Sequence, residues 1–198
     1  MTKSSTVLRD LDLLEDLACD DLVQVYISVT TLDKELARRM EPRASSPGSR
    51  LKTLRVLGKA GIPTGVLASP MIPGLNDWEL DRILEEAAEV GVKSAGYILL
   101  RLPLEVKALF EGWLEANYPE RSDKVLNLIR QTRGGRLYRS EFGVRMKGQG
   151  DYAAMLQRRF DLALRRFGMT QRGKQLNTHY FARPDKPGQQ LGLFGSAY

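Results

Sequence analysis

The stretch DLVQVYISVTTLDKELARRMEPRASSPGSR, at positions 21–50, decides the fold class of this chain. It opens with a half-polar run at 22–30 that predicts a β-strand. Tyr26, Ser28 and Thr30 share one face of that strand, because the side chains of a strand alternate. A charged segment and a Ser-Pro pair follow, and the pair predicts the N-cap and first position of a helix. A strand that ends in hydroxyl groups and leads through a polar loop into a helix is typical of sites in α/β barrels.

The same unit recurs through the first half of the chain. The apolar patterns predict strands at 65–70 and 95–101, and helices at 7–18, 46–60 and 76–90. Gly61 and Gly91 are expected to end the last two helices, and Asn76 with Glu79 is expected to form a capping box at the start of the third. Regular alternation of helices and strands indicates parallel βα units. A closed barrel needs about eight strands, so three can form only part of one. The expected fold class is therefore α/β, a partial (βα) barrel followed by a helical C-terminal extension.

The second half of the chain has a different pattern. Three helical segments follow one another without a strand, and a loop rich in glycine and arginine separates the last two. The helices are expected at 104–117, 120–133 and 151–167. The expected organisation is a partial barrel half at 1–103, a helical extension with a basic loop at 104–169 and a flexible tail at 170–198.

Composition bounds the function. Of the 198 residues, 42% are apolar and 27% are charged, which is typical of a globular protein. The sequence shows no apolar run long enough to span a membrane and no signal peptide, so the cytoplasm is the expected location. One cysteine, Cys19, and one histidine, His179, exclude an internal disulfide and a cysteine or histidine metal site within these residues. The net charge of +6 is a modest bias towards polyanions.

Five short motifs occur in one order at close spacing. Each is weak alone, but the ordered set resembles the later strands of radical S-adenosylmethionine proteins, in the branch similar to spore photoproduct lyase that is often labelled DNA-repair-photolyase-like. The motifs are TKS at 2–4, SVTTLD at 28–33, EPRASSPGSRL at 41–51, GIPTGVLASPMIPGLND at 61–77 and GYILLRLP at 96–103.

The resemblance implies cofactors that this chain could not hold alone. Proteins of that family carry a CxxxCxxC motif whose three thiolates bind a [4Fe–4S] cluster, and the cluster binds and reductively cleaves S-adenosylmethionine. This chain has Cys19 and no second cysteine. We therefore expect the C-terminal portion of such an enzyme, a truncated chain that is inactive alone and binds neither cofactor by itself. Whether it is an enzyme stays open at this point.

The same resemblance assigns five cofactor-binding candidates. Lys3 would pair with the carboxylate of the methionine moiety, and Ser28 would hydrogen-bond the cofactor. Ser69 would present its backbone near the adenine. Thr30 shares the strand face of Ser28, and Arg101, at the end of the third strand, would contact an anion or the substrate.

Each candidate has a plainer interpretation. Lys3 could be an exposed terminal lysine, the hydroxyls could bond the backbone, and Ser69 could be a small residue before a proline. Arg101 could form a structural ion pair with Glu41. Two further arginines, Arg43 and Arg50, are expected to be loop and helix-surface charges.

The glycine- and arginine-rich loop predicts a nucleic-acid contact. Guanidinium groups interleaved with aromatic rings suit phosphate contacts and base stacking. The alternative is a solvated helix end and loop. The candidates are Arg133, Arg136, Tyr138, Arg139 and Arg145.

The tail contains a motif similar to the pentapeptide that binds the bacterial sliding clamp. Gln190, Leu191, Leu193 and Phe194 match it, whereas Gly192 departs from it and adds chain entropy. The alternative is a tail whose apolar residues dock on the parent domain. Binding of a tail peptide to the clamp, with and without Phe194→Ala, distinguishes the two.

Two classes of function therefore compete. The first is part of a radical S-adenosylmethionine enzyme, with nucleic acid as a candidate substrate. The second is a non-enzymatic basic module that binds nucleic acid or the sliding clamp. Under the first hypothesis the strand at 22–30 would have an exposed edge, and exposed edges invite pairing, so self-association is expected.

Overall fold

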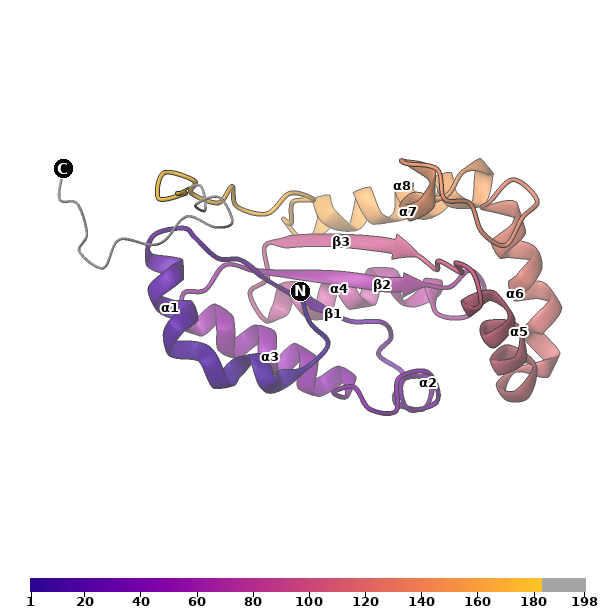
Figure 1. Ribbon diagram of the computed structural model, residues 1–198, viewed down its shortest axis with the longest axis horizontal. Helices are drawn as coiled ribbons and strands as arrows, with labels where there is room; N and C mark the ends of the chain where they lie inside the picture. Colours follow the sequence, from indigo (N-terminus) through magenta and orange to yellow (C-terminus); the bar gives the residue numbers. More distant parts are fainter. Residues whose placement is uncertain (183–198) are drawn as a thin grey trace, which may run out of the picture.

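The computed structural model describes residues 1–182 (Figure 1). Its centre is a parallel sheet of three strands in the order β1 (Val25–Ser28), β2 (Thr64–Met71) and β3 (Ser94–Leu99). Ile27 is paired with Val66, and Val66 with Ala95. The sheet and its helices confirm the α/β class and are consistent with part of a (βα) fold. Within the described residues the sheet stays open and does not close into a barrel.

Both outer strands carry one bridging residue. Thr2 lies beside β1 in parallel, donating its N–H to Tyr26 O over 3.0 Å and accepting from Ser28 N over 2.9 Å. Thr170 pairs in the same way with Ser94 on the far side of β3. The edge that we expected to drive self-association is thus partly occupied by the chain itself.

One face of the sheet is covered by helices. The buried side chains Val66 and Ala95 on this face pack with Leu54, Leu84 and Phe160 from three different helices. These helices are α3 (Pro47–Lys59), α4 (Leu80–Glu89) and α8 (Gly150–Arg166), while η1 (Ser5–Asp10) and α1 (Leu11–Cys19) add partly buried residues. The last helix therefore shares the core of the sheet, although it comes long after the last strand.

The opposite face of the sheet is less covered. Tyr26, Leu67 and Ile98 on this face are only half-buried. A parallel sheet usually has both faces covered. One of the cavities described below is lined by Leu67 and Ile98 from this face.

A second apolar cluster lies beyond the carboxyl ends of the strands, where Figure 1 shows α5 and α6 past the arrowheads of β2 and β3. It joins Ile72 and Leu100, which directly follow β2 and β3, to Leu36, Leu114 and Ile129. The elements are α2 (Lys34–Met40), α5 (Val106–Asn117) and α6 (Pro119–Gln131). This cluster fixes the loops at that end of the sheet.

Two short helices were not expected. α2 begins after Asp33, whose carboxylate accepts from Glu35 N at 2.7 Å and Leu36 N at 3.3 Å. α7 (Val144–Lys147) interrupts the basic loop. Both are too short to show helical periodicity in sequence. The expected ends after α3 and α4 are confirmed, since Gly61 and Gly91 have φ values of 76° and 92°.

The expected role of Asn76 and Glu79 as a capping box is wrong, because both side chains bond across the fold instead. Asn76 accepts from Ile72 N at 2.6 Å and donates to Thr30 O at 2.8 Å and Pro70 O at 3.0 Å. The Glu79 carboxylate accepts from Leu32 N at 3.3 Å. These bonds tie the ends of β1 and β2 together, and the helix starts with the short 3₁₀ turn η2 (Asp77–Glu79).

Candidate active site

Four of the predicted cofactor residues meet at the carboxyl ends of β1 and β2. The carbonyl of Ser69 accepts from Ser28 Oγ and from Thr30 Oγ1, each at 3.0 Å. Lys3 lines the same cavity as Ser28 and Ser69. The hydroxyls therefore do bond backbone, as the plainer interpretation held, and they do so at the rim of a cavity.

Glu41 connects this group to two cations. Its Oε1 pairs with Lys3 and lies 3.1 Å from Thr30 Oγ1, while its Oε2 accepts from Arg50 Nη2 at 2.5 Å. Burial alone would raise the pKa of Glu41, but the hydrogen bonds and charges of Lys3 and Arg50 outweigh it and hold the pKa below its usual value. Glu41 is therefore ionised at neutral pH.

Arg50 is not a surface charge, so that expectation is wrong. Its side chain is only 2% exposed. It donates from Nη1 to Ser28 O at 3.0 Å and from Nε to Ser45 O at 2.8 Å. A buried guanidinium needs such partners, and the loop before α3 supplies them. The expected ion pair between Glu41 and Arg101 does not form either, because Glu41 is already paired with Lys3 and Arg50.

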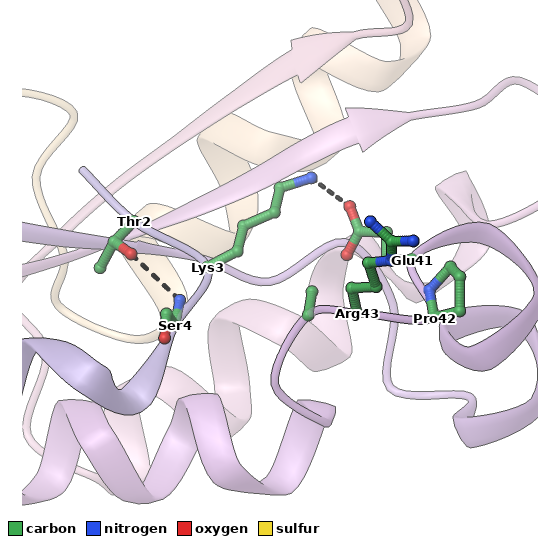
Figure 2. A pocket seen from close by; sticks show the side chains of 7 residues that line it. Thr2, Lys3, Ser4, Glu41, Pro42 and Arg43 are labelled. Atoms are coloured by element: carbon green, nitrogen blue, oxygen red, sulfur yellow. Dashed lines mark hydrogen bonds and ion pairs between the residues drawn. The ribbon is translucent and has the colours of Figure 1, made fainter.

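Two cavities flank Lys3. The first, of about 430 Å³, is lined by Thr2, Lys3 and Ser4 on one side and by residues 41–44 on the other. Figure 2 shows the Lys3 side chain reaching across it to Glu41. The second, of about 310 Å³, is lined by Lys3 together with Leu67 and Ile98 from the open sheet face.

The chemistry of these walls differs from one cavity to the other. The first presents Lys3 and exposed Arg43 against one carboxylate, that of Glu41, so cationic groups outnumber anionic ones and an added carboxylate would be attracted. The second presents Leu67 and Ile98, an apolar surface suited to a flat ring. One cavity thus offers cationic groups, and the other offers an apolar surface.

The residues present do not fit an iron–sulfur cluster. Such a cluster needs several thiolates, and the sequence has one cysteine, which is exposed at the end of α1. Among residues 1–182, no three potential ligand side chains come together as a metal site.

Sequence reasoning missed the joint role of Glu41 and Arg50. Both were visible in the motif EPRASSPGSRL, with one carboxylate and one guanidinium flanking the start of a helix. Nothing in the local pattern indicated that the loop would turn Arg50 inward.

Arg101 and the basic loop lie apart from the Glu41 group. Arg101 follows β3, and Arg133 is fully buried rather than solvated. Arg139 pairs with Glu141 at 2.7 Å, and the Arg145 guanidinium lies 5.4 Å from the Phe142 ring centre. Arg136 is exposed, while Tyr138 packs against the second apolar cluster.

The predicted clamp-binding residues Gln190, Leu191, Leu193 and Phe194 lie outside the described residues. Within residues 1–182, none of the helices combines the length and apolarity that crossing a membrane requires.

Comparison with known proteins finds uncharacterized relatives and one family model that matches part of the chain. An uncharacterized protein of Acidianus two-tailed virus is 36% identical over 46% of this chain and 31% of its own length. One from Methanocaldococcus jannaschii is 31% identical over 64% of this chain and 46% of its own. One from Mycobacterium tuberculosis is 29% identical over 66% of this chain and 39% of its own length. The matched part of the chain thus spans between 31% and 46% of the length of these relatives. No solved structure matches it. Residues 1–87, which contain Lys3, Ser28, Glu41 and Ser69, match the Radical SAM superfamily.

Proposed function

We propose that this chain supplies the cofactor-binding wall of a radical S-adenosylmethionine enzyme, as the C-terminal portion of its barrel. The observation that carries the proposal is the group of Lys3, Glu41 and Arg50 between two cavities. It lies within the residues that match the superfamily. The ordered motifs favour the branch similar to spore photoproduct lyase.

The residues divide the work of binding. Lys3 and Arg43 attract the carboxylate of the methionine part, and Leu67 and Ile98 receive the adenine. Arg50 is a positioning residue, because it holds Glu41 and through it Lys3. When bound beside a reduced cluster, S-adenosylmethionine supplies a carbon radical that abstracts hydrogen from a substrate.

Activity requires a cluster-bearing segment that these residues do not contain. The single cysteine supports this, and so does the limited share of the relatives that the chain spans. Without that segment the chain is inactive.

The binding wall can be tested directly. We expect S-adenosylmethionine to cause saturable NMR shifts of the Thr2, Ser28 and Ser69 amides. Lys3→Ala should weaken this binding by about tenfold, since a charge-assisted hydrogen bond is lost. Lys52→Ala, an exposed lysine on α3, is the matched control and should bind normally. NMR shifts confined to amides elsewhere on the protein would refute the proposed binding wall.

The missing segment needs a second experiment. Joining a CxxxCxxC segment to the chain and reconstituting it with iron and sulfide should allow reductive formation of 5′-deoxyadenosine. The same assay on the chain alone should give none. Stoichiometric iron on the chain alone would contradict the proposal.

A second candidate is a nucleic-acid-binding module. One observation favours it: Phe142 is 90% exposed in the basic loop, beside the Arg145 guanidinium. An exposed ring next to a cation suits base stacking. Phe142→Ala should weaken binding of a single-stranded oligonucleotide, whereas Phe181→Ala, another exposed ring outside the basic loop, should not.

A further inference from the structure

Three arginines near the carboxyl end of β3 have no paired carboxylate among residues 1–182. Arg101, Arg133 and Arg145 each have a buried Nε without a hydrogen-bond partner among residues 1–182. No carboxylate of the described residues pairs with any of them; the one ion pair of the basic loop joins Arg139 to Glu141. Guanidinium groups cannot shed their charge by deprotonation, so burial makes an external anion favourable.

Arg133 holds this region together. Its Nη1 donates to Val144 O at 2.6 Å, and its Nη2 donates to Leu100 O at 2.9 Å. It thereby links the start of α7 to the residue directly before Arg101. Figure 1 shows α7 beside the arrowhead end of β3. Burial, and then the nearby charge of Arg101, lower the pKa of Arg133.

A neighbouring half-buried lysine shows how the fold compensates a cation without a carboxylate. Lys147 donates to Gln157 Oε1 at 3.1 Å and lies 3.9 Å from the ring centre of Tyr97. Its charge is compensated by an amide and an aromatic face. Two of the arginines have less: Arg101 makes no side-chain hydrogen bond within the described residues, and Arg145 has only the Phe142 ring.

We propose that Arg101, Arg133 and Arg145 form a binding site for a phosphate oxyanion. Arg101 and Arg145 are partly exposed and supply the donors. Arg133 is fully buried, bonds the carbonyls of the residues next to them in sequence, and is a positioning residue that adds positive field. Guanidinium forks match the spread oxygens of phosphate better than a single point charge does. The carboxyl end of a parallel sheet is where α/β folds place their ligands. The site goes beyond the proposed function, because it does not depend on S-adenosylmethionine.

The test is to titrate the chain with inorganic phosphate while recording arginine Nε–Hε signals by NMR at constant ionic strength. We expect saturable shifts of Arg101, Arg133 and Arg145. Arg101→Gln and Arg145→Gln should each weaken the binding by about tenfold or more. The matched control is Arg139→Gln, an arginine of the same loop that already has a carboxylate partner, and it should bind phosphate normally.

Titrations with other ligands test whether the site prefers phosphate, and whether that phosphate belongs to a polymer or to a small molecule. Acetate should bind more weakly than phosphate, and equal affinity would overturn the phosphate assignment. An oligonucleotide that competes with phosphate and depends on Arg101 identifies a polymer phosphate; competition by a nucleoside monophosphate alone identifies a small one. Either result supports the site. Phosphate acting no better than chloride, or equal loss in Arg139→Gln, would overturn it.

Discussion

Two groups of cations lie at the same end of the sheet and are treated differently by the fold. Beside β1 and β2, Lys3 and Arg50 share the carboxylate of Glu41. Beyond β3, burial and then the nearby charge of Arg101 lower the pKa of Arg133. Within residues 1–182 the first group carries its own counter-charge, whereas no carboxylate pairs with Arg101 or Arg133.

This difference in charge pairing indicates a different role for each group. Because the carboxylate of Glu41 neutralises part of the positive charge of Lys3 and Arg50, this group mainly stabilises the fold. Only the remaining positive charge is available to attract a ligand. No carboxylate of the described residues compensates the arginines beyond β3, so their positive charge is available to attract a ligand. Stability should therefore depend on Glu41 without any ligand, whereas the β3 group should affect stability mainly when an anion is present.

The largest expected effect is from Glu41→Gln. It leaves Arg50 buried without a counter-charge, and breaking a buried pair costs about 3 kcal/mol or more of unfolding free energy. Urea unfolding followed by circular dichroism measures it. Glu35→Gln breaks an exposed helical pair with Arg39 and should cost less than about 0.5 kcal/mol. Equal losses in the two variants would erase the contrast between buried and exposed pairs.

The next effect is stabilisation by phosphate. At about ten times its dissociation constant, phosphate should raise the unfolding free energy by about 1.4 kcal/mol through mass action. The gain should survive in Glu41→Gln and disappear in Arg101→Gln. Thermal unfolding at fixed ionic strength is the measurement. If the gain instead disappeared in Glu41→Gln and survived in Arg101→Gln, the anion would bind beside Glu41.

A smaller effect is expected from Thr30→Val. The Thr30 hydroxyl is bonded to Ser69 O at 3.0 Å and is buried, so its loss should cost about 1 kcal/mol. Thr178→Val, at an exposed site, is the control in the same urea experiment. No loss at Thr30 would show that Ser28 alone holds the Ser69 carbonyl.

The smallest effect near neutral pH concerns protonation of Glu41. Its folded pKa is depressed, so its contribution is complete above the unfolded pKa of about 4.3 and is lost as the pH falls through the folded value. The difference in unfolding free energy between the native chain and Glu41→Gln should thus be constant near pH 7 and shrink below pH of about 4. A difference that grew on acidification would reverse the sign.

Much of the framework followed from local patterns. The run GVLASP predicted a strand at 65–70, and β2 covers Thr64–Met71. Gly61 and Gly91 ended helices where expected, because a left-handed backbone conformation at those positions favours glycine. The strand at 22–30 was predicted too long: Thr30 already leaves the sheet to bond with Asn76.

Among the site residues, Lys3, Ser28, Thr30 and Ser69 were brought together as the ordered motifs implied, and the chemistry assigned to them stays a prediction. Arg50 and Arg133 were misplaced on the surface, although both are buried. An arginine in a polar, charged stretch of sequence is expected on the surface. Only the packing of other segments around it shows that it is buried.

The sequence by itself determined the alternation of strands and helices, the parallel sheet and the lack of cluster cysteines, because these depend on periodicity, turn residues and composition. The tertiary structure alone decided which charges are paired. Glu41 meets Lys3 and Arg50, and Arg101 meets no carboxylate among the described residues, because an ion pair depends on distances between segments far apart along the chain.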